Sequence, residues 1–379
     1  MLQLVANSFI MIKRLLYLAG LAIIGVVVFH AVGMGFVAMF DWADRYLPAS
    51  VPAISQVGGF SYYFLRFFEQ AANYSILTFL FVSGFFIAIA TGRNQRTISW
   101  RIVGVRIKTL LIPYLFWSFV VIFLLILQGE RFSIQKLVVA LLVGRANPVY
   151  YFVPLLIQFY LLAPFLVPLA RNHWKPLVAV TALLQLLVVL SYYPSVFTIN
   201  VGPVLTLFQN IPQWFFLAFI FWFPLGMVIA FHTEQARKIF YRFRWWLLIL
   251  TVLLLFIGMI EWELLYNASG LDWLSNRTTV VDELYALTFI LAFLGFSDAK
   301  LPLTKQIDKI GSMAFGIYLT HALFIEYSAR LINHFLPRLL AYQALLAVLL
   351  TCIGLLGPIV LMEFVSRTRL RRFYTYLFG

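Results

Sequence analysis

A single histidine, His30, lies in an otherwise apolar stretch from residue 15 to 36. An ionisable side chain inside a bilayer is energetically costly and usually faces the interior of a helix bundle. Imidazole titrates near neutral pH, so it can take a proton from a hydroxyl group. At 16 residues after Arg14, His30 lies about 24 Å along a helix, in the outer half of a core about 30 Å thick. We predict that His30 is a general base, and the alternative is a histidine that packs between helices.

A histidine base is usually oriented by a carboxylate. Glu69, just before the second apolar stretch, is the first choice for this partner. Glu261, Glu263 and Glu326 are rivals, and the sequence leaves the choice between them open.

The segment from residue 92 to 108 is unusually basic. It contains Arg93, Arg96, Trp100, Arg101, Arg106 and Lys108. Five cations exceed what membrane orientation requires, and arginine matches phosphate oxygens in a bidentate manner. The tryptophan could stack on a nucleobase. The segment therefore predicts a site for a phosphate-bearing donor, with an anchor for lipid headgroups as the alternative.

The composition places these residues in a membrane protein. Of 379 residues, 63% are hydrophobic and 11% are charged, whereas a soluble domain has about 25% charged residues. The single cysteine excludes an internal disulfide and a cysteine-based metal site, and no histidine pair has metal-ligand spacing, so we expect no metal. The net charge of +14 is better explained by membrane orientation than by a nucleic-acid partner. We expect one membrane-embedded domain over residues 1–379.

Ten apolar stretches are long enough to cross a bilayer as helices. They lie near residues 15–36, 74–91, 109–128, 150–170, 176–192, 214–231, 245–264, 280–297, 310–330 and 343–364. An even number puts both termini on one side, and with that side inside, 20 of the 28 basic residues lie in cytoplasmic segments. We therefore predict an all-α bundle of about ten transmembrane helices with both termini in the cytoplasm.

Several stretches together resemble a known family. They are 21–30, which ends in the histidine, 79–85 (Phe-Leu-Phe-Val-Ser-Gly-Phe), the arginine-rich 101–114, which ends in Pro-Tyr, 150–160 and 316–321. In their order and spacing they are similar to the integral-membrane acyltransferase 3 family, which O-acylates bacterial surface glycans. The stretch 150–160 looks more like the branch that modifies exopolysaccharides. One departure is Ala19, where members often have an arginine, so Arg14 or another cation takes its place or the donor is handled differently.

The resemblance implies an acyl-CoA donor, most often acetyl-CoA, with succinyl as an open alternative. It also implies a multi-pass protein of the bacterial cytoplasmic membrane and a glycan acceptor. On this hypothesis the basic segment holds the phosphates of the donor, and His30 deprotonates a sugar hydroxyl. The mouth for the sugar is predicted to be lined by Tyr150, Tyr151, Gln158 and Trp262.

Two other functions remain open at this stage. An exporter of a polysaccharide or of a lipid-linked sugar would also carry ionisable residues inside the membrane. A structural partner in a polysaccharide-synthesis complex is the third possibility. Ser83, followed by Gly84, indicates close helix packing rather than a nucleophile. We interpret His321 as mainly structural.

Overall fold

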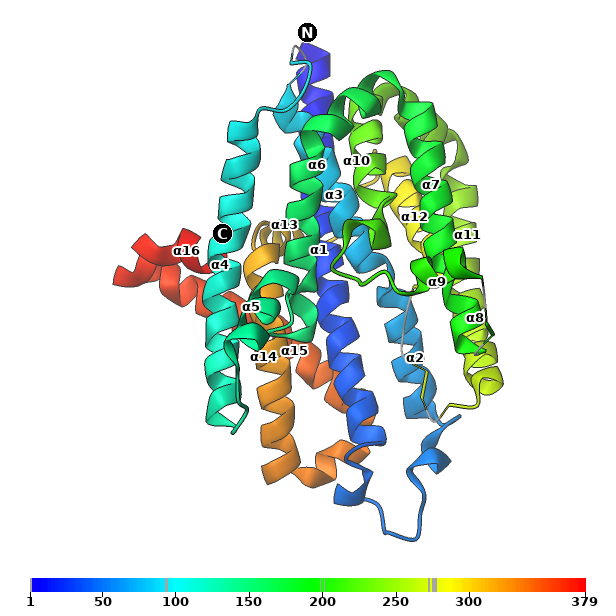
Figure 1. The fold of residues 1–379 in the computed structure, drawn as a ribbon, viewed down its shortest axis with the longest axis vertical. Coiled ribbons are helices and arrows are strands. Elements are labelled where there is room, and N and C mark those ends of the chain that lie inside the picture. The colour runs from blue at the N-terminus through cyan, green and yellow to red at the C-terminus, as the bar shows by residue number, and fades with distance from the viewer. Residues whose placement is uncertain (1, 93–94, 198, 201, 272, 275–277) are drawn as a thin grey trace. The chain divides into compact units, whose positions relative to one another are not determined.

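The computed structural model describes residues 2–92, 95–197, 199–200, 202–271, 273–274 and 278–379, with side chains described from residue 13 onward. Figure 1 shows the elements in chain order. Every regular element in the described ranges is a helix. The all-α fold class expected from the sequence is therefore confirmed.

Seven helical stretches in the described part of the chain are long and apolar enough to cross a membrane. They are Lys13–Met39, Phe60–Thr91, Trp100–Leu127, Pro148–Asn172, Trp174–Val196, Thr233–Ser269 and Gln343–Arg367. Each contains or closely matches one of the ten predicted stretches. Together they indicate a multi-pass membrane protein.

The other three predicted stretches fall on helices outside this set. These helices are α10 (Trp222–Phe231), α12 (Val280–Gly295) and α14 (Ala314–Phe335). The first two have 10 and 16 residues, fewer than the roughly 20 that a crossing needs. The count of ten crossings and the cytoplasmic placement of the termini stay predictions.

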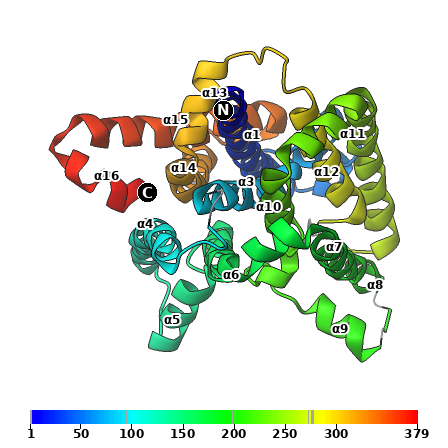
Figure 2. The same ribbon diagram turned by 90° about the horizontal axis from the view of Figure 1, so that it is seen from above.

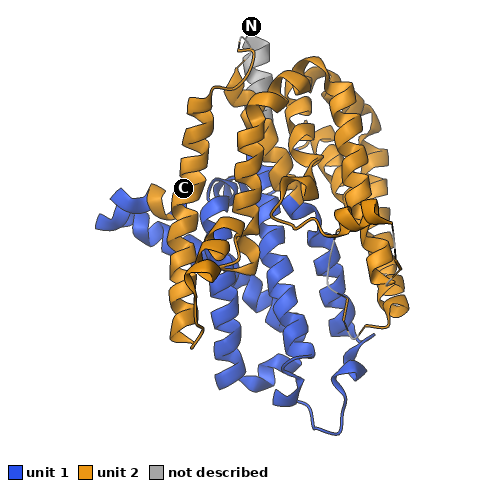
Figure 3. Cartoon of the chain, in the orientation of Figure 1, with its two compact units in different colours: residues 1–76, 300–374, 378 blue, residues 77–299, 375–377, 379 orange. Residues whose placement is uncertain are grey.

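The first of two compact units comprises residues 1–76, 300–374 and 378, drawn in blue in Figure 3. Its helices are α1 (Leu2–Met39), η1 (Ala43–Arg45), η2 (Ala53–Gln56), α2 (Phe60–Ala72), α13 (Thr304–Ser312), α14, η5 (Pro337–Ala341), α15 (Gln343–Arg367) and η6 (Arg369–Phe373). Helix α1 contacts α2, α13, α14 and α15. It is apolar around most of its circumference, as expected of a helix enclosed by others. Figures 1 and 2 show α1 and α14 side by side.

The second unit comprises residues 77–299, 375–377 and 379. Its helices are most of α3 (Tyr74–Thr91), then α4 (Trp100–Leu127), α5 (Ile134–Val143), η3 (Pro148–Tyr151), α6 (Phe152–Asn172), α7 (Trp174–Leu190), α8 (Tyr192–Val196), α9 (Pro203–Gln209), η4 (Phe216–Phe219), α10, α11 (Thr233–Ser269) and α12. The residues of α16 (Tyr374–Phe378) are divided between the two units. The expectation of one domain over residues 1–379 stays a prediction.

Glycines allow close backbone contact between two helices of the second unit. A Cβ atom at Gly84 of α3 would overlap the carbonyl oxygen of Phe223, and one at Gly226 of α10 would overlap that of Phe81. Small residues allow such backbone contact between helices in a membrane. The packing role predicted for the Ser83-Gly84 pair is therefore confirmed at the glycine.

Candidate functional site

Two histidines meet in the first unit, His30 from α1 and His321 from α14. The centroids of their rings are 5.3 Å apart, and the ring planes are inclined at 44°. His321 is fully buried, whereas His30 is partly exposed. A substrate can therefore reach His30 more readily than His321.

Backbone carbonyls determine the tautomer of the neutral His321 ring. Its Nδ1 atom lies 2.8 Å from the carbonyl oxygen of Tyr318 and 3.1 Å from that of Ile317. A carbonyl oxygen can only accept, so Nδ1 carries the hydrogen and Nε2 of the neutral ring is an acceptor. This buried Nε2 has no hydrogen-bonding partner among the described residues. A basic lone pair is therefore present beside His30.

A glycine of α15 sets the spacing of the helices that carry the two histidines. A Cβ atom at Gly354 would lie 2.8 Å from Cγ1 of Ile325 in α14 and 2.9 Å from Cγ1 of Val27 in α1. Both side chains lie about one helical turn from the histidine of their own helix. The absence of a side chain at Gly354 thus lets α1 and α14 keep their present separation.

The predicted carboxylate partners of His30 are engaged elsewhere. Glu69 forms a buried ion pair with Arg66, one turn earlier in α2. Glu326 pairs with Arg330 at 2.5 Å, and Glu261 accepts hydrogen bonds in the second unit. None of these, nor Glu263, forms a hydrogen bond or ion pair with His30 in the described part of the chain. The assignment of Glu69 as the partner of His30 stays a prediction.

The basic segment runs directly into a membrane-spanning helix. Helix α4 begins at Trp100, capped by the hydroxyl of Ser99, nine residues before the predicted start of the third crossing. Its side chains Arg101, Arg106 and Lys108 are exposed. Together with Arg96, which is also exposed, they form no ion pair with a carboxylate among the described residues. Arg93 lies outside the described residues. This group of four cations is available to an anion.

Helix α6 holds the loop that precedes α4. The guanidinium of Arg171 donates hydrogen bonds to the carbonyl oxygens of Gln95 at 2.6 Å and Gly92 at 2.8 Å. The Thr97 hydroxyl donates to the carbonyl oxygen of Pro164 at 2.5 Å. The ring of Trp100 meets that of Phe165 edge-on at 6.2 Å. Arg171 therefore has a structural task that its place in the sequence did not reveal.

The predicted acceptor residues occupy different environments within the second unit. Tyr150 is fully buried and meets Tyr114 edge-on at 6.0 Å, and Tyr151 is partly exposed. Gln158 donates to the carbonyl oxygens of Pro154 and Trp214 and accepts from the Phe216 amide. Its amide thus fastens the segment before α10 to α6. The contact of Tyr150, Tyr151 and Gln158 with a sugar stays a prediction.

Trp262 belongs to an aromatic cluster near the end of α11. Its ring stacks on Tyr266 with centroids 5.0 Å apart and lies 5.2 Å from Trp273. The neighbouring Glu261 accepts hydrogen bonds from the hydroxyls of Tyr193 at 2.5 Å and Thr279 at 2.6 Å. These bonds join α11 to the start of α12 and to α8, and they give the aromatic cluster a fixed support.

Two further features add to the chemistry of the second unit. The side chain of Ser83 lies close to that of Tyr160, which also lies near the charge of Arg106. Glu283 of α12 accepts hydrogen bonds from Nε1 of Trp222 at 2.7 Å and Nε2 of Gln185 at 2.9 Å. Glu283 was not predicted as a functional residue, although an acidic residue at the start of an apolar stretch is a signal that the sequence contains.

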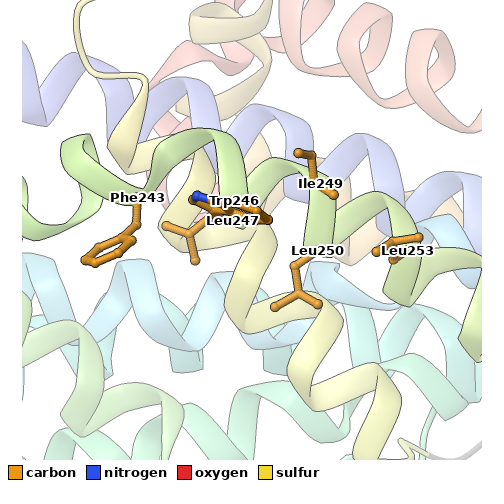
Figure 4. A pocket seen from close by; sticks show the side chains of 6 residues that line it. All are labelled: Phe243, Trp246, Leu247, Ile249, Leu250 and Leu253. Atoms are coloured by element: carbon orange, nitrogen blue, oxygen red, sulfur yellow. The ribbon is translucent and has the colours of Figure 1, made fainter.

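A hollow along α11 contains no group suited to acid–base chemistry. Figure 4 shows its lining side chains. They are Phe243, Trp246, Leu247, Ile249, Leu250 and Leu253. Only 17% of the most apolar stretch of α11 is buried, which suits a surface in contact with lipid. The histidine pair of the first unit and the α4 cations of the second unit are therefore treated as two separate candidate sites.

Comparison with known proteins gives one result. A family model described as an acyltransferase domain matches residues 13–363, which is nearly the whole chain. Comparisons with curated proteins and with solved structures gave no match. Both histidines and all four described cations of the basic segment lie within the matched residues.

Proposed function

Because this chain belongs to the acyltransferase 3 family, we propose that it transfers an acyl group from acyl-CoA to a hydroxyl group of an extracytoplasmic glycan. The family match and the seven apolar helices indicate a multi-pass membrane acyltransferase in general. The donor, the acceptor and the base are the specific parts of the proposal. The observation that carries it is the pair of imidazoles on adjoining helices of the first unit.

In the proposed reaction His30 acts as the general base. The oxygen of the acceptor hydroxyl attacks the carbonyl carbon of the thioester, and its proton passes to the neutral His30 ring. The new C–O bond forms as the C–S bond breaks, and the departing thiolate then takes the proton from His30. The acyl group therefore passes directly from the donor to the acceptor, without a covalent intermediate on the enzyme. The partial exposure of His30 supports its role as the ring that meets the substrate.

The donor part of the proposal rests on the cations at the start of α4. Acyl-CoA carries several phosphate groups, which suit arginine and lysine side chains that have no internal partner. Arg96, Arg101, Arg106 and Lys108 have no carboxylate partner among the described residues, and Trp100 is 56% exposed, so its ring can stack on the adenine. We propose acetyl-CoA as the donor and the cytoplasmic side of a bacterial membrane as the place where it binds.

The acceptor part rests on aromatic side chains. Sugar rings present apolar faces that pack on tryptophan and tyrosine. In the cluster near the end of α11, Trp262 is buried, and its neighbours Tyr266 and Trp273 are partly exposed and supply such rings. The likeness of residues 150–160 to the exopolysaccharide-modifying branch favours an exopolysaccharide. Tyr151 is the partly exposed residue of that stretch, and we propose that it contacts the sugar.

Binding of acetyl-CoA to the detergent-purified protein tests the donor assignment. We expect binding to wild type and a loss of at least tenfold in affinity in an Arg101→Ala/Arg106→Ala variant, since each charge-assisted bond contributes about 1.5–3 kcal/mol. The matched control is Arg131→Ala/Arg145→Ala, which removes two other exposed arginines of the same unit.

The result can also overturn the assignment. Equal loss in both double variants would mean that net charge, and not the α4 site, governs binding. If no short acyl-CoA binds, the assignment of acyl-CoA as the donor would be wrong, and the exporter function would be favoured.

A further inference from the structure

We propose that His321 is the positioning residue for His30 and takes the role that a carboxylate has in other histidine bases. The inference rests on the proposed function, because it assigns a partner to the base of that reaction. It replaces a structural interpretation of His321 with a chemical one. Three features of the first unit support it.

The first feature is the fixed tautomer of His321. Two backbone carbonyls hold its Nδ1–H group, so the lone pair on Nε2 is the atom that remains for chemistry. A histidine needed only for packing satisfies its polar atoms, because an unpaired buried acceptor costs about 1–3 kcal/mol. Here Nε2 is buried without a partner among the described residues. This cost is expected where the atom serves a function.

The second feature is the distance between the rings. The ring centroids are 5.3 Å apart, and two imidazole rings at this separation come within hydrogen-bonding distance once a nitrogen of each faces the other. The rings are inclined at 44°, and rotation about the Cβ–Cγ bond of His30 has a broad, shallow energy profile. A small turn of this ring therefore lets one of its N–H groups donate to Nε2 of His321.

The third feature is that the carboxylates that could replace His321 as the partner of His30 already form ion pairs. Within the first unit, Glu69 is paired with Arg66 and Glu326 with Arg330. His321 needs no such partner, because carbonyl groups of its own helix orient it. The order of contacts is then substrate, His30, His321 and the α14 backbone.

This order determines what each nitrogen does in the reaction. One nitrogen of His30 stays protonated and donates to Nε2 of His321, so its other nitrogen presents a lone pair to the acceptor hydroxyl. When His30 takes the hydroxyl proton, the imidazolium keeps its hydrogen bond to His321, which stabilises the new charge. His321 exchanges no proton with the substrate, and for this reason we call it a positioning residue.

Two substitutions at His321 separate positioning from packing. In His321→Asn the amide NH2 can still donate to the carbonyls of Ile317 and Tyr318, but the acceptor at the Nε2 position is gone. In His321→Gln the longer amide can place an oxygen near the Nε2 position and loses the backbone contact. We expect His321→Asn to lower kcat by about 10- to 100-fold, a part of the roughly 100- to 10,000-fold that general-base catalysis contributes. We expect His321→Gln to retain more activity than His321→Asn, with the KM for acetyl-CoA unchanged in both.

A purely structural role predicts the opposite order. His321→Asn would then be the milder change, and His321→Gln would lose thermal stability and activity together. That order, or wild-type turnover in His321→Asn, would overturn the inference.

Nitrogen NMR of histidine-labelled protein in detergent micelles gives a readout that does not depend on activity. We expect His30 to adopt one tautomer in wild type and a mixture of two in His321→Asn, with His30→Ala used to assign the signal. An unchanged His30 signal in His321→Asn would also refute positioning. If wild type shows the single tautomer but consumes no acyl-CoA, the proposed function fails while the pairing of the two histidines stands.

Discussion

Adding one methyl group at Gly354 is expected to slow catalysis by moving the two histidines apart. The Cβ atom of Gly354→Ala would lie 2.8 Å from Cγ1 of Ile325 and 2.9 Å from Cγ1 of Val27. Carbon atoms in ordinary contact are about 3.5–4.0 Å apart, so these neighbours must yield by roughly 0.7 Å or more. The methyl group acts as a wedge between α1 and α14.

The size of the effect follows from this displacement. A misplacement of about 1 Å can lower a rate by about 100-fold, so we expect kcat to fall by about 10- to 100-fold. Overpacking costs about 1–3 kcal/mol, and the better helix propensity of alanine returns about 1 kcal/mol. The net loss of stability is therefore about 0–2 kcal/mol, and the protein should remain folded.

The assay is release of free CoA from acetyl-CoA by purified protein, together with its thermal unfolding. Gly33→Ala is the matched control, because it adds the same methyl group one turn after His30 and that methyl meets nothing within 4 Å. We expect Gly33→Ala to keep wild-type turnover. Full activity of Gly354→Ala, or an equal loss in Gly33→Ala, would refute the reasoning that links helix spacing to catalysis.

Two further substitutions test the surroundings of the site. Arg66→Ala leaves the Glu69 carboxylate buried without its ion-pair partner, so we expect a loss of about 3–5 kcal/mol in stability. In the double variant Arg66→Ala/Glu69→Gln, we expect both the thermal stability and the turnover to return toward wild-type values. If the stability returns and the turnover does not, Glu69 would be the partner of His30 after all. Arg171→Ala removes the bonds to the carbonyls of Gln95 and Gly92, and we expect weaker acetyl-CoA binding with unchanged thermal stability. Binding equal to wild type would show that the loop before α4 needs no support.

Much of the helical framework could be predicted, because the length of a run of apolar residues can be measured from the sequence alone. The stretches that became α6 and α15 were located to within a few residues, whereas α1 begins 13 residues before the stretch predicted for it. The start of α4 was placed too late, because its first three turns carry the cations Arg101, Arg106 and Lys108, which lower the apolar content without breaking the helix. Helices α10 and α12 proved shorter than the apolar stretches that contain them.

The candidate site was predictable only in part. His30 stood out because it is the one ionisable group in its stretch, but its neighbour His321 belongs to a helix near the other end of the chain. Their contact depends on tertiary packing, which apolar length and residue spacing do not encode. The same holds for Gln158, whose bonds to Trp214 and Phe216 join elements that the sequence shows only as separate stretches.

The most direct test of acyl transfer with His30 as base uses vesicles that contain the protein. Isotope-labelled acetyl-CoA is supplied on the face that carries the α4 cations, with an exopolysaccharide acceptor on the other face, for wild type and His30→Ala. We expect label to reach the polysaccharide in wild type and to be at background in His30→Ala, with both proteins present in equal amounts. Substantial labelling by His30→Ala would contradict the assignment of His30 as the base, and no labelling by wild type would contradict transfer from acetyl-CoA.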